Sequence, residues 1–328
     1  TITIPKTSFS IIGGIFEGCI NLEKVIINSD IKECRINGTE FADCKKLKSI
    51  ELPASLEKIE SNSNFYFENV SKDFKFILDS KNSFFSVSTD GKMLTSKDGK
   101  TLYAWIGASG DITVPDGLTA IGSNFFSNNK NITSVIIPDS VESVSDSAFA
   151  NCTNLTSVVF PKKLKSGKFY SEYNIETYEY EEIEHIRLNL SGCENLTSVI
   201  LPTNITFVDF SGCKKIEKLV LPASSTGVSV KECANLKSIE FENGVKDLAF
   251  SYNSFKGCAN LELIKFPASL EFIGFKNDKH PVCFPSLCDS PKLKFEVDSN
   301  NENFSTADNG KMLTSKDGKT LYAWAGLS

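Results

Sequence analysis

The chain has 328 residues, of which 41% are hydrophobic and 23% charged, and its formal net charge at pH 7 is −6. This length suits one large domain or two ordinary ones, and the apolar fraction is sufficient for a sizeable core. The acidic balance disfavours binding to nucleic acid, which requires a basic face. Every apolar run is too short for a membrane span, so no membrane insertion of this segment is expected. The chain opens in the middle of a repeat, at residues 2–5, without a leader peptide, which suggests a piece of a longer precursor.

One sequence motif recurs along the chain: an aromatic residue, then cysteine, leucine, isoleucine, leucine and proline at fixed spacings. Residues 149–161 and 255–267 are two of its eight clear copies. Adjacent copies lie about 20 to 25 residues apart, and Cys193 and Cys213, for example, are 20 apart. A unit of this length cannot bury its apolar side alone, so the copies are expected to stack as the coils of a solenoid.

Each copy contains one predicted strand, in which alternate residues such as Ile50 and Leu52 face the interior. Stacking would place successive strands side by side in a parallel sheet, about 4.8 Å apart. Proline directly follows the strand in most copies, where its missing N–H ends the pairing. Fragments of the same pattern occur at residues 2–4 and 112–114.

Eight of the ten cysteines occupy the same position of the repeat, and a phenylalanine stands three residues before most of them. The phenylalanines are predicted to form an aromatic column inside the coils. Cysteines on adjacent coils would have Cβ atoms about 4.8 Å apart, somewhat beyond the roughly 3.5–4.5 Å of a relaxed disulfide. We therefore favour buried free thiols that donate to turn carbonyls, and bridging of some pairs stays open as the alternative. We call the cysteines at this repeat position the cysteine ladder, and Cys34 and Cys283 lie outside it.

This repeat resembles the BspA-like leucine-rich repeats, which occur on the surfaces of some bacteria and protist parasites. The resemblance rests on segments such as 149–158 and 137–141, and it extends over most of the chain. It implies a single leucine-rich-repeat domain over residues 1–328: a right-handed α/β superhelix with a concave parallel β-sheet, rich in β-structure and with few short helices. Members of the family are generally exported, and some act as adhesins for host matrix proteins. The family offers no catalytic motif that could be carried over.

Fifteen residues occur twice without change, at 91–105 and at 310–324. Both copies hold Asp-Gly between short apolar runs, which is a strong signal for a two-residue hairpin turn. The sequence therefore predicts two inserted β-hairpins that protrude from the solenoid, over residues 84–106 and 304–325. Their apolar residues are expected to pack against the neighbouring repeat.

Strand residues that alternate with the inward-facing ones are expected on the concave surface of the solenoid. The central outward residue is apolar in four successive copies, at Ile136, Val159, Ile200 and Val220. Serines and threonines stand beside it. A contiguous exposed apolar stripe often marks an interaction site, but β-branched residues are also simply good strand formers. Both interpretations stay open.

The segment 165–187 departs most from the repeat in its composition. It contains six glutamates and four of the eight tyrosines, namely Tyr170, Tyr173, Tyr178 and Tyr180. One interpretation is an irregular, degenerate repeat that fills the 41 residues from Cys152 to Cys193. The other is a protruding, acidic contact surface, since tyrosine favours interfaces.

The sequence contains little that could support catalysis or metal binding. Only two histidines occur, and His185 is expected on the solvent face of a strand-like run. His280, Cys283 and Cys288 could supply three metal ligands, but their spacing matches no known zinc motif. No phosphate loop, dinucleotide fingerprint or nucleophile elbow occurs. We therefore predict no enzyme activity, no metal site and no cofactor.

Taken together, the sequence predicts a non-catalytic protein that binds another macromolecule. The resemblance implies an adhesin-type protein, secreted or at the cell surface, whose partner is a host or matrix protein or glycoprotein. A structural spacer within a larger surface protein is the alternative, and an enzyme is the least favoured function. The oligomeric state is open, with a monomer favoured.

Overall fold

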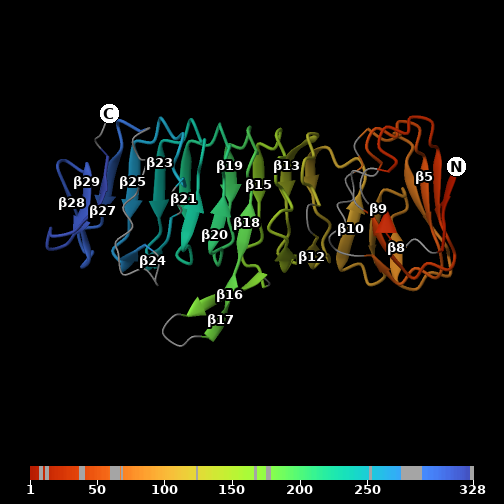
Figure 1. Cartoon of the computed structure of the whole chain (residues 1–328), viewed down its shortest axis with the longest axis horizontal. Coiled ribbons are helices and arrows are strands. Elements are labelled where there is room, and N and C mark those ends of the chain that lie inside the picture. Colours follow the sequence, from red (N-terminus) through yellow and green to blue (C-terminus); the bar gives the residue numbers. More distant parts are fainter. Residues whose placement is uncertain are drawn as a thin grey trace.

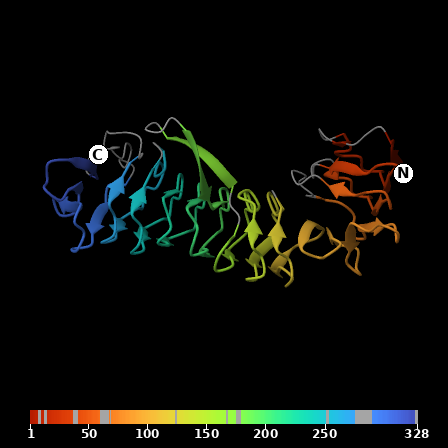
Figure 2. The ribbon, with the colours of Figure 1, turned by 90° about the horizontal axis from the view of Figure 1, so that it is seen from below.

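The chain forms one elongated stack of coils, with its two termini at opposite ends of the stack (Figure 1). Seen from below, the stack is curved rather than straight (Figure 2). The structure is a computed structural model that describes residues 1–6, 10–11, 15–36, 41–59, 67, 69–122, 125–165, 168–174, 179–250, 253–274 and 290–325. For residues 10–11, 35–36, 168–174 and 179–185 it describes the backbone alone.

The motif strands lie side by side and pair in parallel, so the predicted stacking of parallel strands is confirmed. They form three successive four-stranded sheets. The first contains β1 (Ile2–Ile4), β3 (Lys24–Ile27), β5 (Ser49–Leu52) and β7 (Lys75–Leu78). The second contains β11 (Gly110–Thr113), β13 (Ile132–Ile136), β15 (Ser157–Val159) and β19 (Ser198–Ile200). The third contains β21 (Lys218–Leu221), β23 (Ser238–Phe241), β25 (Leu263–Phe266) and β27 (Lys294–Val297).

Most coils carry a second, shorter strand on the return path, and these strands also pair in parallel. They are β2 (Ser10–Ile11), β4 (Glu33–Ile36), β6 (Lys58–Ile59), β12 (Ala120–Ile121), β14 (Ser143–Val144), β18 (Arg187–Asn189), β20 (Phe207–Asp209), β22 (Gly227–Ser229), β24 (Asp247–Leu248) and β26 (Phe272–Ile273). The prediction of an α/β solenoid with few short helices is wrong for the described residues, because none of them lies in an α-helix. The return segments bury single residues such as Val208 and Val228 at a period of two, which suits a strand and offers no helical apolar stripe.

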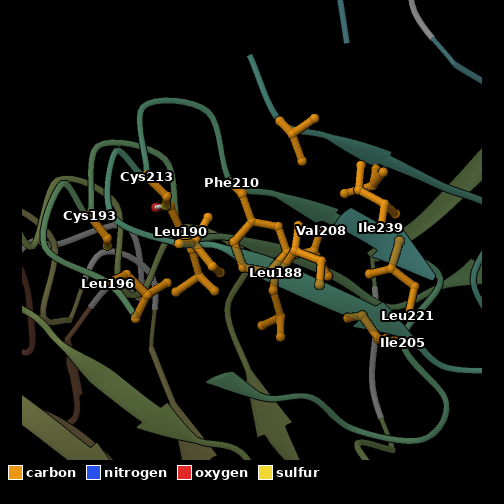
Figure 3. Packing of buried hydrophobic residues seen from close by; sticks show 14 of the residues in the cluster. Leu188, Leu190, Cys193, Leu196, Ile205, Val208, Phe210, Cys213, Leu221 and Ile239 are labelled. Atoms are coloured by element: carbon orange, nitrogen blue, oxygen red, sulfur yellow. Dashed lines mark hydrogen bonds between the residues drawn. The ribbon is translucent and has the colours of Figure 1, made fainter. Parts of the chain in front are cut away.

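The interior of the coils is apolar throughout. Figure 3 shows this packing around Phe210, where Leu188, Leu190 and Val208 gather from successive parts of two coils. Phenylalanine forms short stacks in the same interior: Phe149 lies 5.2 Å from Phe126 between ring centroids. The core divides into two clusters, one over the first hundred residues and one over the remainder of the chain.

The cysteine ladder is confirmed where it is described, because its members are free and mostly buried. Each buried thiol donates a hydrogen bond to a carbonyl of the preceding coil, as Cys152 does to Phe126 at 2.9 Å and Cys213 to Leu190 at 3.2 Å. Cys19 differs, since it is exposed. Cys283 and Cys288 lie outside the described residues.

The two predicted inserts, residues 84–106 and 304–325, form antiparallel sheets of three strands rather than two-stranded hairpins. The strands are β8 (Phe85–Val87), β9 (Met93–Ser96) and β10 (Thr101–Trp105) in one, and β28 (Phe304–Ala307), β29 (Met312–Ser315) and β30 (Leu321–Trp324) in the other. The first does not protrude, because β10 also pairs in parallel with β12 and so joins the return-path sheet. Burial of Leu94 and Leu102 holds this sheet against the coils.

The tyrosine- and glutamate-rich segment forms a regular antiparallel ribbon rather than a further coil. The ribbon consists of β16 (Lys168–Asn174) and β17 (Glu179–His185), which pair over seven residues each. It stands off the stack in both views (Figures 1 and 2). Residues 175–178, which include Tyr178, lie outside the described part of the chain.

Candidate partner-binding surfaces

The apolar stripe occupies the outward face of the second main sheet. Thr113, Ile136, Val159 and Ile200 are in register across its four strands. Ile136 is 48% exposed and Ile200 is 58% exposed, while Val159 between them is half-buried. Three β-branched apolar side chains therefore form a continuous surface row, as the sequence predicted for these positions.

Strand alternation explains why these residues face outward. The residue before each of them packs inward: Val135 and Val158 are almost completely buried, and Val199 is partly buried against the core. Because successive side chains point to opposite faces of a strand, burial of the valines forces their neighbours into solvent. A one-residue slip would bury the stripe and expose the valines, so the register is strongly specified.

A row of polar residues runs beside the stripe. Asp111, Ser134, Ser157 and Ser198 are in register on the same face. The Asp111 carboxylate accepts hydrogen bonds from the hydroxyls of Ser134 and Thr133, both at 2.7 Å. These bonds, first that of Ser134 and then that of Thr133, lower the pKa of Asp111 below its usual value. The N-terminal end of the stripe is thus bordered by a fixed negative charge.

Val220 is exposed at 44% but does not continue this row. It lies on β21, and β19 and β21 belong to different sheets. The outward row of the third sheet continues from Val220 to Glu240 and Lys265. Glu240 lies 3.3 Å from Lys265 and 3.5 Å from Lys218, and the hydrogen bond from Lys265 is the main cause of its lowered pKa. The third sheet therefore presents charge where the second presents an apolar surface.

The first main sheet carries a shallow groove on its outward side. Its volume is about 480 Å³, and Thr3, Ile26, Glu51 and Ile77 line its floor. Ile77 is 48% exposed, and Glu51 pairs with Lys24 at 2.6 Å. The apolar positions here alternate with a charged one, so no continuous apolar row forms.

Three of the four predicted tyrosines fall on the strands of the ribbon. Tyr170, Tyr173 and Tyr180 lie on β16 and β17, with Tyr173 directly opposite Tyr180 in the register. Tyr178 lies outside the described residues, as do the side chains of the other three. The ribbon and the stripe are separate surfaces, because the ribbon's strands pair with no strand of the main sheets.

Three members of the outward rows, Asp111, Thr113 and Ile77, were missed from the sequence. Thr113 was counted only within the fragment at residues 112–114 and Asp111 not at all, although both pair with the full copy that follows. Ile77 was missed because its strand lacks both the cysteine and the proline. The alternation of Lys75, Phe76, Ile77 and Leu78 was the available signal.

The described residues contain neither a cluster of potential metal ligands nor a helix that could span a membrane. No group of three or more histidine, cysteine, aspartate or glutamate side chains among them could hold a metal ion. His280, Cys283 and Cys288, the possible ligands named from the sequence, lie outside the described residues, as does the side chain of His185. In the same part of the chain, no helix has the length and hydropathy that a membrane span requires.

A family model for the BspA type leucine rich repeat region matches the chain in six copies, over residues 1–88, 103–190 and 168–277. The chain belongs to this BspA-type family. Membership confirms the resemblance inferred from the motif, and the matched coils include every strand of the stripe. A sequence comparison with curated proteins gives no match.

Several solved leucine-rich-repeat structures are similar in fold. A protein from Bacteroides ovatus shares 19% identity at a TM-score of 0.41, with 90% of this chain and 83% of that chain covered. The pneumococcal vaccine antigen PcpA shares 17% identity at a TM-score of 0.47, with 94% of this chain and 62% of that chain covered. A leucine rich cell surface protein from Faecalibacterium prausnitzii shares 15% identity at a TM-score of 0.34, with 85% of this chain and 80% of that chain covered. At TM-scores this low, none of them bears on what this BspA-type chain binds.

Proposed function

We propose that this chain is a non-catalytic binding scaffold of a secreted or cell-surface protein, and that a protein or glycoprotein partner docks on the stripe of Ile136, Val159 and Ile200. The single observation that carries the proposal is the continuous exposed row of these residues. Val220 extends the contact onto the third sheet, and the tyrosines of the ribbon form a second contact. Family membership supports export, because BspA-type proteins are generally exported.

The chemistry of the stripe suits a protein partner. Exposed β-branched side chains release water when they are covered, at about 25 cal/mol per Å² of apolar surface. The adjacent serine hydroxyls offer donors and acceptors along one edge of the patch. An apolar centre with a polar rim is the usual composition of a protein–protein interface.

The test is to measure binding of the chain to immobilised fibronectin and fibrinogen by biolayer interferometry. Ile136→Lys places a charge within the apolar stripe and should weaken binding at least tenfold, which is the effect expected when a residue that contributes strongly to an interface is lost. Ile77→Lys is the matched control, because Ile77 occupies the same strand position on the first sheet and is also 48% exposed. Equal losses in both variants would show that the stripe is not the contact surface.

A structural spacer is the second candidate, and the elongated stack of coils favours it (Figure 1). A spacer needs length and rigidity but no partner on its outward face. Failure of both immobilised glycoproteins to bind the folded chain, checked by circular dichroism, would contradict the adhesin-type function and leave the spacer.

A further inference from the structure

The ribbon is inserted at a single position of one coil. In the coil that follows, the N–H groups of Thr206 and Phe207 donate to the carbonyl of Ile186 at 2.9 and 3.2 Å. In the coil that precedes, the N–H of Lys165 donates to the carbonyl of Glu142. In a regular coil, one residue donates its N–H to the preceding coil and accepts, through its carbonyl, from the following coil. Here Lys165 makes the first of these hydrogen bonds and Ile186 accepts the others.

The spacing of the sequence supports this assignment. Lys165 lies 13 residues after Cys152, as Thr206 does after Cys193, and Ile186 lies 7 residues before Cys193. Removing the 21 residues 165–185 would shorten the interval from Cys152 to Cys193 from 41 to 20 residues, which is the interval of the next two coils. The ribbon is therefore an addition to a complete coil and not a part of the core.

Both long edges of the ribbon are open in the described structure. β16 and β17 pair with each other alone, as a two-stranded sheet. An unpaired edge presents a row of N–H and C=O groups that can accept a further strand. The ribbon stands away from the coils in both views, so a strand could reach either edge (Figures 1 and 2).

The composition of the ribbon determines which strand would fit. Its two strands contain five glutamates against one lysine, Lys168. The register places Glu172 directly opposite Glu181, and like charges at opposed positions destabilise a sheet. A strand that carries positive charge would relieve this repulsion, whereas an acidic or neutral strand would not.

We propose that the ribbon is a docking arm that binds a basic, extended segment of a partner protein by strand addition to one of its edges. This inference rests on the proposed binding function and deepens it for the ribbon, independently of the stripe. Backbone hydrogen bonds supply the pairing, and the glutamates select a segment rich in lysine or arginine. The competing interpretation is that the glutamates only protect the open edges against aggregation.

Three capped eight-residue peptides test the proposal: alternating Arg-Thr, alternating Arg-Pro and alternating Glu-Thr. The Arg-Pro peptide has the charge of the first, but proline lacks the N–H that a ladder requires. Fluorescence anisotropy should show binding of the Arg-Thr peptide, with at least tenfold weaker binding of the other two. Binding should also weaken as salt rises, because the ribbon stands off the coils and salt screens attraction between charges in contact with solvent.

Two variants locate the binding to the ribbon. Deletion of residues 165–185 should abolish peptide binding and leave the circular dichroism of the coils intact. Reversing charge with Glu181→Lys, Glu182→Lys and Glu184→Lys keeps the ribbon and should exchange the preference for the Arg-Thr and Glu-Thr peptides. Hydrogen exchange should slow at amides of 168–174 or 179–185 when the Arg-Thr peptide binds.

The possible outcomes separate the alternatives. Equal affinity for the Arg-Thr and Arg-Pro peptides, or binding without slower amide exchange, would overturn strand addition. Binding that survives the deletion would place the site elsewhere, and no binding of any peptide would favour edge protection. The peptide experiment does not involve the stripe, so failure of the fibronectin and fibrinogen experiment would leave its result standing.

Discussion

Three buried thiols, those of Cys213 and Cys233 on the ladder and of Cys34 off it, remain protonated in the folded chain well above the pH at which a free thiol ionises. Burial raises the pKa of Cys213 and of Cys233, and it raises the pKa of Cys34 to about 12 from a usual value of 9.0. Burial disfavours the charged thiolate because the apolar interior cannot solvate it. At the residue scale, the thiols of Cys213 and Cys233 are therefore neutral hydrogen-bond donors and poor nucleophiles.

We predict that the chain loses stability above about pH 9. In the unfolded state these thiols ionise near 9.0, whereas in the folded state they stay protonated, so the unfolded state binds fewer protons above that pH. Their stabilising contribution is fully present below pH 9 and falls by about 1.4 kcal/mol per pH unit for each thiol as the pH rises further. Urea unfolding at pH 8, 9 and 10 measures this slope.

Cys213→Ala is the control for that measurement, because it removes one titrating group. The variant should be less stable at pH 8, since it leaves a cavity, but its loss of stability with pH should be shallower than that of the parent chain. An identical slope in the two proteins would contradict the assignment of the pH dependence to buried thiols.

At the element scale, two glycines of the first three-stranded sheet have the same backbone conformation but different surroundings. Gly91 has φ of 74°, and Gly99 has φ of 72°. A Cβ added at Gly91 would lie 2.8 Å from the Cβ of Lys75, whereas one added at Gly99 would meet no atom within 4 Å. The turn at Gly91 thus requires glycine because of its positive φ and because of the close approach of Lys75. The turn at Gly99 requires it because of the positive φ alone.

We predict that Gly91→Ala destabilises the chain more than Gly99→Ala. Gly99→Ala should lower the free energy of unfolding by about 1–2 kcal/mol, which is the cost of a left-handed conformation for a residue with a Cβ. Gly91→Ala should exceed that loss by about 1 kcal/mol or more, because Lys75 must also shift. Guanidinium unfolding of the two variants provides the comparison, and equal losses would count against the close approach.

The parts of the fold that could be predicted from sequence are those governed by local pattern. Inward-facing residues at every second position identified the main strands, and with them the outward positions of Ile136 and Ile200. The return strands could not be told from helices in the sequence, because elements of two to four residues contain too few positions for their period of two to be distinguished from a helical one. The separation of Val220 was not predictable either, since its copy of the motif is regular and only the pairing between β19 and β21 is missing.

The single-position insertion of the ribbon required the structure. Composition marked residues 165–187 as unusual, but only the hydrogen bonds of Lys165 and Ile186 show that they share one place in the coil. The parallel pairing of β10 with β12 is a second feature that required the structure. It links a strand of an antiparallel sheet to a repeat strand further along the chain. Pairings between elements of different types leave no periodic signal.

At the scale of the whole molecule, the two core clusters should respond separately to mutation. Leu56 is buried in the cluster of the first hundred residues and Leu236 in the other. Because each coil contacts only its neighbours, stability is nearly a sum of local terms. Leu56→Ala should lower local stability by about 2–5 kcal/mol and speed amide exchange in 24–59, while exchange beyond Thr113 stays unchanged.

Leu236→Ala is the matched variant and should produce the reverse pattern. Hydrogen exchange with mass spectrometry resolves both effects in one experiment. If either variant accelerated amide exchange uniformly along the chain, the stack would unfold as a single unit. That result would contradict the separation of the two core clusters.

The stacking of coils also determines how the molecule would behave under load. A force applied between its two ends acts along the row of coils, and among the described residues no strand at one end of the row pairs with a strand at the other. The coils would detach singly, and each coil of 20 residues would release about 70 Å of extended chain. Such a chain would lengthen in many small steps under tension, so the coils that remain folded would keep their shape while the others extend.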